Sequence, residues 1–189
     1  MTWLLVVLGG GLGLTLCDQL HIHAGVLAYP SSDVRIGDQS WWVAPQFLAA
    51  ALLILAAAAI VVRIRPRPGS WTTVTRAGVW FVGIYAATAM FEHHPRVLAI
   101  VVTLLWIDRV ILRTDRWQLI GFSIALALTG TLYEGTLAGS GAFAYRHPDV
   151  FHVPMWLPAL YLHGAVLAVA VARALLIGER AEEAVKAVP

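Results

Sequence analysis

The residues best suited to chemistry in this sequence are histidines and carboxylates near the ends of apolar segments. The histidines are His21, His23, His93, His94, His147, His152 and His163, and Asp18, Glu92 and Glu134 lie at similar depth. Imidazole and carboxylate groups bind metals and transfer protons, so one hypothesis is a metal-dependent enzyme. Against it, the sequence contains no HExxH or comparable motif. These residues could equally be hydrogen-bonded groups at span ends, or the lining of a polar pocket.

The composition indicates a membrane protein. Of the 189 residues, 59% are hydrophobic and 13% are charged, and the mean hydropathy is +0.75. A soluble domain this apolar would aggregate, so we predict an integral membrane protein with one compact domain. The net charge of +2 is too small to suggest a nucleic-acid partner. Cys17 is the only cysteine, which excludes an internal disulfide and a cysteine-based metal site.

Residues 41–62 form the clearest membrane-spanning segment. The segment contains no charge and one strongly polar side chain, Gln46. A helix of this length spans roughly 33 Å, which matches the ~30 Å hydrocarbon core of a bilayer. Trp41 and Trp42 mark one end, where aromatic rings favour the lipid boundary. Arg63 follows the other end, which we therefore predict to be cytoplasmic.

Similar segments recur along the chain, and no strand pattern interrupts them. We predict an all-α membrane protein, a bundle of six transmembrane helices at about residues 3–20, 41–62, 74–91, 96–112, 117–138 and 155–177. The inner side then holds ten basic residues, which are Arg63, Arg65, Arg67, Arg76, Arg109, Arg113, Arg116, Arg173, Arg180 and Lys186. The outer side holds three, which are Arg35, Arg96 and Arg146. Because basic residues favour the cytoplasmic side, we expect both termini there.

A few polar side chains lie inside these apolar segments, and bundles direct such groups inward. Glu134 is the most informative, because a carboxylate inside a span should face the bundle or a wet cavity. It could also pair with a neighbouring His or Tyr. Sparse polar groups around an apolar hollow are typical of a lipid site. We predict a lipid-binding cavity lined by Gln46, Tyr85, Thr88, Trp106, Thr129 and Glu134, with interhelical hydrogen bonding as the alternative for each.

Several short motifs keep one order and an almost gap-free spacing between about residues 10 and 177. They are Trp41-Trp42-Val43-Ala44-Pro45, Phe81-Val82-Gly83-Ile84, Thr114-Asp115-Arg116, Pro148-Asp149 and Trp156-Leu157-Pro158. As a set they resemble the Insig (insulin-induced gene) family of sterol-responsive membrane proteins. The resemblance implies a six-span bundle with a central cavity open to lipid, which binds an oxysterol in eukaryotic members. It also implies a protein that is not an enzyme and that holds a membrane partner through its helices.

The same resemblance suggests where a partner binds. Asp115 matches a cytoplasmic-loop aspartate linked in the family to partner binding, so we assign that role to Asp115 and Arg116. The chain differs from the family at His21 and His23, which replace a Gln-x-Gln. Twelve arginines against one lysine suggest a bacterial genome. We therefore expect the bacterial plasma membrane, or the endoplasmic reticulum if the source is eukaryotic.

The leading hypothesis is a non-enzymatic, Insig-like lipid sensor or adaptor for another membrane protein. Its ligand would be a sterol-, isoprenoid- or diacylglycerol-like lipid with a small polar head, and we expect no metal and no cofactor besides this lipid. Gly9 and Gly13 share one helix face, where a second helix could approach closely, so a homodimer or homotrimer is possible. The metal-dependent enzyme is the alternative. A transporter ranks third, because no charged relay crosses the whole bilayer.

Overall fold

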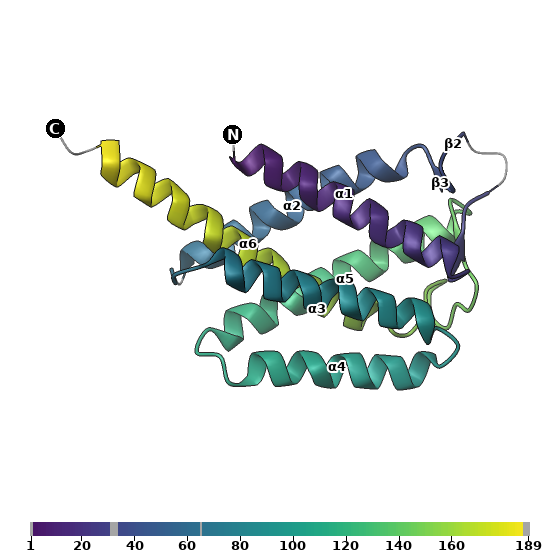
Figure 1. Cartoon of the computed structure of the whole chain (residues 1–189). Helices are drawn as coiled ribbons and strands as arrows, with labels where there is room; N and C mark the ends of the chain where they lie inside the picture. Colours follow the sequence, from purple (N-terminus) through teal and green to yellow (C-terminus); the bar gives the residue numbers. More distant parts are fainter. Residues whose placement is uncertain (1, 31–33, 65, 187–189) are drawn as a thin grey trace.

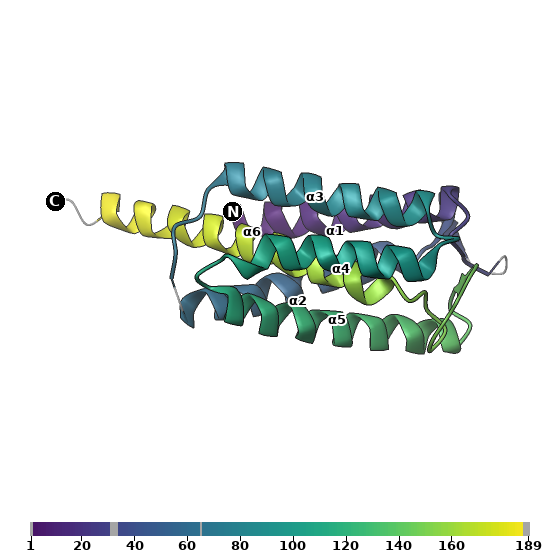
Figure 2. The same ribbon diagram turned by 90° about the horizontal axis from the view of Figure 1, so that it is seen from below.

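The chain folds into a bundle of helices that run back and forth along one axis (Figure 1 and Figure 2). This computed structural model describes residues 2–30, 34–64 and 66–186, with side chains as far as Leu176. Within these ranges the helices are α1 (Thr2–His23), α2 (Val43–Ile64), α3 (Trp71–Met90), α4 (Pro95–Ile111), α5 (Arg116–Gly139) and α6 (Leu157–Lys186). The six segments predicted to be helical are therefore helices. Arg65 and the side chains of Arg180 and Lys186, assigned above to the inner side, lie outside the described residues.

Four of these helices are long and apolar enough to cross a membrane. They are α1, α2, α5 and the Leu157–Leu176 part of α6. The other two, α3 and α4, do not meet the same limits of length and composition, and α4 has only 17 residues. The apolar helices support an integral membrane protein, in agreement with the composition.

Helix α1 is longer than predicted and ends at His23. Asp18 and His21, which we expected near the end of this span, lie inside the helix, and both are buried. Residues three apart share a helix face, and both side chains point into the bundle as that spacing indicates. His23 is exposed, on the opposite face from His21. The helix continues three residues beyond the predicted end, because partners from other segments make the burial of Asp18 and His21 favourable.

Helix α6 is central and packs against α2, α3, α4 and α5 (Figure 2). On the other side of the bundle, α1 packs against α2 most closely at Gly11, where a Cβ atom would lie 2.9 Å from the Cα atom of Leu48. The close helix approach predicted at Gly9 and Gly13 is not made within the described chain. A Cβ atom at either position would have no neighbouring atom within 4 Å.

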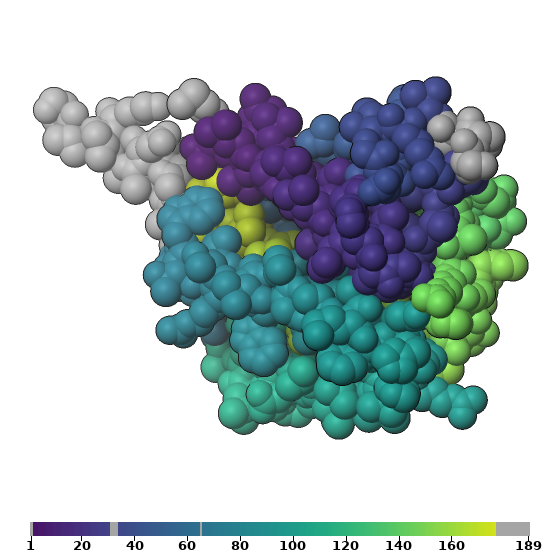
Figure 3. All heavy atoms as spheres, turned by 45° about the vertical axis from the view of Figure 1, so that its right-hand side comes forward, coloured from purple at the N-terminus to yellow at the C-terminus, as the bar shows by residue number. Residues whose placement is uncertain are grey.

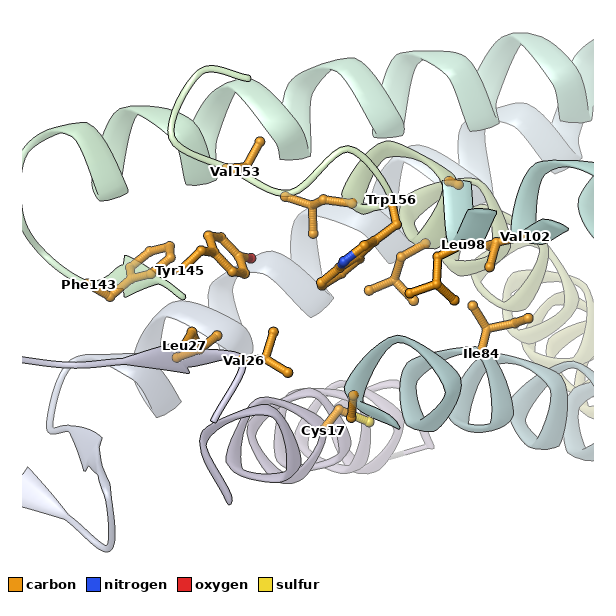
Figure 4. Close-up of a cluster of buried hydrophobic side chains, with 14 of the residues drawn as sticks. Cys17, Val26, Leu27, Ile84, Leu98, Val102, Phe143, Tyr145, Val153 and Trp156 are labelled. Carbon is orange, nitrogen blue, oxygen red and sulfur yellow. The ribbon is translucent and has the colours of Figure 1, made fainter. Parts of the chain in front are cut away.

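Short strand pairs cover one end of the bundle, contrary to the prediction of no strands. β1 (Leu27–Ala28) pairs antiparallel with β4 (Ala144–Tyr145), and β2 (Arg35–Ile36) pairs with β3 (Gln39–Ser40). We call this the outer end, where α1, α3 and α5 finish, and the opposite one the inner end. The β1–β4 pair joins the first and fifth connections, and it presents Tyr145 to the cluster of buried side chains in Figure 4.

The two ends differ in charge. Among the described side chains, seven arginines lie toward the inner end, namely Arg63, Arg67, Arg76, Arg109, Arg113, Arg116 and Arg173. Three lie at the outer end, namely Arg35, Arg96 and Arg146. The excess expected from the sequence is thus present at one end of the folded bundle.

Candidate functional site

An apolar cavity of about 330 Å³ lies among α1, α2, α3 and α6. Its wall includes Gly9, Gly13 and Cys17 from α1, and Gly78 and Phe81 from α3. A Cβ atom at any of these three glycines would meet no atom within 4 Å, so their missing side chains help to create the space. In Figure 3, yellow atoms of α6 are visible through a gap between α1 in purple and α3 in blue-green. The cavity therefore opens toward the side of the bundle, between α1 and α3.

The six residues predicted to line a lipid site do not border this cavity. Thr129 is exposed and donates its hydroxyl hydrogen to the carbonyl oxygen of Ala125 at 2.8 Å. Its predicted inward position was wrong, because a hydroxyl satisfied by its own helix needs no partner in the bundle. Trp106 is buried in the apolar core of the inner half. Gln46 is half-buried, and its Oε1 atom finds no hydrogen-bond partner among the described residues.

The remaining three predicted residues belong to a buried cluster near the outer end. We call it the outer polar core, and it consists of Asp18, His21, Tyr29, Gln39, Tyr85, Thr88, Glu134, Tyr145 and Tyr161. Phe81 lies next to it, because its ring is 5.8 Å from that of Tyr85. The outer polar core therefore adjoins one wall of the apolar cavity. Thr88 and Glu134 make hydrogen bonds to other segments there, which is the alternative considered for them, and Tyr85 packs its ring on His21 of α1.

Asp18 is one of two carboxylates in the outer polar core, and it is only 5% exposed. Its Oδ2 atom accepts hydrogen bonds from the Tyr29 hydroxyl at 3.0 Å and from the Gln39 side-chain amide at 2.8 Å. Burial raises the pKa of Tyr29 far above its ordinary value, and the charge of Asp18 raises it further. Tyr29 therefore keeps its hydrogen and remains a donor. The first connection thus satisfies a carboxylate that the helix alone would leave unpaired.

His21 connects α1 to α3 within the same core. Its Nε2 atom lies 3.0 Å from the Thr88 hydroxyl, which itself donates to the Tyr85 carbonyl at 2.8 Å. Because that hydroxyl hydrogen is already used, we assign the hydrogen between the two residues to Nε2 of His21. The imidazole ring also packs on Tyr85 at 4.2 Å and meets Trp156 edge-on at 5.4 Å. His21 is fully packed and serves as an interhelical bridge.

Glu134 accepts hydrogen bonds from the hydroxyl groups of Tyr145 and Tyr161. Tyr145 comes from β4 and Tyr161 from α6, so the carboxylate of α5 ties a connection to the central helix. Burial raises the pKa of Tyr145, and the Glu134 charge raises it further, so this residue is a donor. Figure 4 shows Tyr145 beside Trp156, and their ring centroids are 6.2 Å apart. The sequence left two options for Glu134, a cavity-lining position or a pair with a neighbouring His or Tyr. The structure has the pair, with two tyrosines.

The histidines do not converge on a metal site. Among the described residues, no group of three or more His, Cys, Asp or Glu side chains could hold a metal ion. His163 lies on α6, away from the outer residues, with Nε2 donating to the Val102 carbonyl at 3.0 Å. Its Nδ1 atom accepts a hydrogen bond from Arg109 at 2.9 Å. This imidazole therefore connects α6 to α4, as an interhelical hydrogen bond.

A second polar cluster lies at the inner end. A pocket of about 890 Å³ is bordered by Arg67, Arg76, Arg109, Arg113 and Arg173, together with Asp115, and we call it the inner arginine pocket.

Asp115 is the buried centre of this cluster, and it is only 2% exposed. It accepts hydrogen bonds from Arg173 at 2.6 Å and from Arg113 at 3.2 Å, and Arg67 lies 3.7 Å away. Burial alone would raise the pKa of Asp115, but the two arginine partners outweigh it and lower the pKa to about 2. Asp115 is therefore committed to contacts within the chain. Arg116, the other predicted partner-binding residue, is exposed beside Trp117.

Sequence reasoning did not predict the apolar cavity, since it assigned Gly9 and Gly13 to a helix contact, and it missed Arg173 as the partner of Asp115. Gly78 and its neighbours have no polar group to attract attention, although their spacing within an apolar helix could have indicated an open face. The Asp115–Arg173 pair joins residues far apart in the sequence, and no local pattern signals such a contact.

The membrane-length apolar helices and the cavity that opens to the side of the bundle place this chain among the α-helical membrane proteins. The fold is similar to that of a mycobacterial Insig homologue, MvINS from Mycobacterium vanbaalenii. The TM-score is 0.72 at 21% sequence identity, over 92% of this chain and 93% of that one. A cross-linked trimer of a cysteine variant of MvINS matches equally well. The fold is therefore Insig-like, as the motifs suggested. No family model and no curated protein match the chain.

Proposed function

We propose that this chain binds the apolar part of a lipid in the cavity between α1 and α3. The observation that supports this proposal is the cavity itself, whose volume of about 330 Å³ lies within the range of small-molecule sites. Its wall is made of glycine and apolar side chains such as Val74, Val82 and Leu167. Such a wall suits hydrocarbon and offers little to a charged substrate. The proposal is a binding role without catalysis.

The wall also narrows the class of lipid. Its side chains carry few polar atoms, chiefly the Cys17 thiol and the Trp71 indole nitrogen. A ligand with a small polar head therefore fits better than one with several charges. A sterol-, isoprenoid- or diacylglycerol-like lipid meets this requirement, and its head would remain near the mouth between α1 and α3.

We further propose that the inner end faces the cytoplasm, because its arginine excess follows the positive-inside rule. The membrane would then be the bacterial plasma membrane, with both termini on the cytoplasmic side. A lipid in the cavity would contact α1 and α3 together, and its presence would be sensed by a partner or a second copy of the chain. Arg116 is available for such a contact, whereas Asp115 would act by holding the loop in shape. The trimer of MvINS supports a homo-oligomer as the form to test first.

The proposal can be tested with two glycines of α3, of which one borders the cavity and the other does not. A Cβ atom at Gly78 or Gly83 meets no atom within 4 Å, but only Gly78 borders the cavity. Gly78→Leu should place a side chain in the cavity from a position where its Cβ atom meets no neighbour, and Gly83→Leu is the matched control. Each protein is purified, and its lipids are extracted and identified by mass spectrometry. We expect one enriched lipid species in the wild type and in Gly83→Leu, reduced about tenfold in Gly78→Leu. Bulk phospholipid alone in all three proteins would contradict the proposal.

A further inference from the structure

The inner arginine pocket has a concentration of positive charge that the lipid cavity does not explain. Its arginines come from four separate segments: the α2–α3 connection, α3, α4 with the connection after it, and α6. Among the described residues that border it, Asp115 is the one carboxylate against five arginines. We propose that this pocket binds a phosphate group.

The charge balance around Asp115 supports this assignment. Three guanidinium groups, those of Arg67, Arg113 and Arg173, lie within 3.7 Å of its carboxylate. One carboxylate balances one of these charges, so the folded chain holds the other two close together. Arg76 and Arg109 border the same pocket and increase the excess. Like charges this close repel one another, and a bound anion would relieve the repulsion.

Donors in the pocket are also left free. The Nε atom of Arg173 is buried and has no hydrogen-bond partner among the described residues, although the residue is only 8% exposed. Arg76 makes no hydrogen bond or ion pair within the described chain, and its side chain is exposed. Arginine presents several N–H groups in a planar fork that matches phosphate oxygens. A phosphate at this position would use donors that the fold leaves unoccupied.

The shape of the pocket places the anion at the membrane boundary. The pocket lies where α3 begins and α4 ends, and Trp80 and Leu112 form its apolar border. Arg109 packs over the Trp80 ring at 5.2 Å, which fixes one guanidinium against an aromatic surface. Gly69 closes the other side, because a Cβ atom there would lie 2.6 Å from the α6 backbone at Arg173. Basic pockets between helices on the cytoplasmic side are typical sites for anionic lipid headgroups. The phosphate could therefore belong to a phospholipid or be free in solution.

The experiment measures binding to the full chain in detergent by native mass spectrometry. The three probes are a short-chain phosphatidylglycerol, the diacylglycerol with the same chains, and inorganic phosphate. Arg76→Gln removes a pocket arginine that holds no other part of the chain in place. The matched control is Arg63→Gln, because Arg63 is exposed at the same end but does not border the pocket. Arg67→Gln is a second variant in case Arg76→Gln does not fold.

We expect phosphatidylglycerol to bind the wild type and Arg63→Gln alike, and to bind Arg76→Gln roughly five- to tenfold more weakly. Inorganic phosphate that displaces the lipid with similar affinity would support the site and assign it to a soluble anion. Phosphatidylglycerol that binds no better than diacylglycerol, or that is unaffected by Arg76→Gln and Arg67→Gln, would overturn the proposal. Gly78→Leu should keep phosphatidylglycerol binding, so the lipid-cavity proposal and the phosphate-site proposal can be confirmed or contradicted independently.

Discussion

The two ends of the bundle both bury carboxylates, but they stabilise them by opposite means. At the outer end, the carboxylates of Asp18 and Glu134 accept hydrogen bonds from neutral groups. The donors are a tyrosine and a glutamine for Asp18, and two tyrosines for Glu134. At the inner end, Asp115 is surrounded by three guanidinium groups. Asp18 and Glu134 are therefore satisfied by neutral donors alone, whereas Asp115 leaves positive charge and an unpaired Arg173 Nε–H group beside it. The polar groups of Asp18 and Glu134 thus serve the packing of the outer end, and the inner end is the one where we propose a ligand.

The largest expected effect comes from breaking the inner ion pairs. Asp115→Asn removes the charge that holds Arg113 and Arg173, and it leaves a buried guanidinium uncompensated. We expect the free energy of unfolding to fall by about 3 kcal/mol, measured by thermal unfolding in detergent. Asp108→Asn is the control, because Asp108 is exposed on the neighbouring α4. Equal stability of the two variants would show that the inner cluster is not held together by Asp115.

Acid should weaken the same contact. The pKa of Asp115 is about 2 in the folded chain, below its ordinary value of 3.8. The unfolded chain therefore takes up a proton first, and the stabilisation is present above about pH 4 and lost as the pH falls toward 2. The wild type should lose about 2 kcal/mol more than Asp115→Asn over this interval. Parallel pH curves for the two proteins would contradict the assignment of the shift to Asp115.

A smaller effect is expected at the outer end, where the donors are neutral. Tyr145→Phe removes one of the two hydrogen bonds to Glu134 and keeps the ring beside Trp156. The expected loss is about 1 kcal/mol, because a second tyrosine remains as a donor. Tyr133→Phe serves as the control, since Tyr133 is 50% exposed on the same helix as Glu134. A loss as large as that of Asp115→Asn would remove the distinction between the two ends.

The smallest effect is expected for the exposed ion pair of the outer end. His23 and Asp38 approach to 3.6 Å, but their side chains are 64% and 54% exposed. Water and salt screen such a pair, so Asp38→Asn should change the unfolding free energy by no more than about 0.5 kcal/mol. A change above 1 kcal/mol in a thermal unfolding experiment, which is outside the range for exposed pairs, would show that this loop contributes more than its contacts indicate.

The sequence predicts the helices well because their formation depends on local hydropathy. The limits of α2 and α4 differ from the predicted segments by only a few residues. The end of α1 was predicted at residue 20, three residues too early, because His21 and His23 are typical of a span boundary. Only Tyr29, Gln39 and Thr88 make the burial of Asp18 and His21 favourable. Local pattern carries no information about such distant partners.

The candidate site was harder to predict, because polar residues in the spans bond to groups of the chain and do not border the apolar cavity. Glu134 found two tyrosines, and Thr129 found a carbonyl of its own helix. The cavity arises where side chains are missing, at Gly9, Gly13 and Gly78. Gly9 and Gly13 were noted from the sequence only as a face for a second helix, and Gly78 was overlooked. The fold class and the family resemblance were recoverable from sequence, but the cavity wall required the packing of four helices.

The most direct test of the lipid cavity is to locate a bound lipid by photo-crosslinking. A diacylglycerol analogue with a diazirine in its acyl chain is added to the purified protein, irradiated, and mapped by peptide mass spectrometry. We predict attachment to cavity residues of α1 and α3 such as Leu14, Val74 and Val82, and its loss in Gly78→Leu but not in Gly83→Leu. Attachment spread over the outward faces of α4 and α5, at residues such as Leu104 and Leu128, and unchanged in Gly78→Leu, would contradict the account.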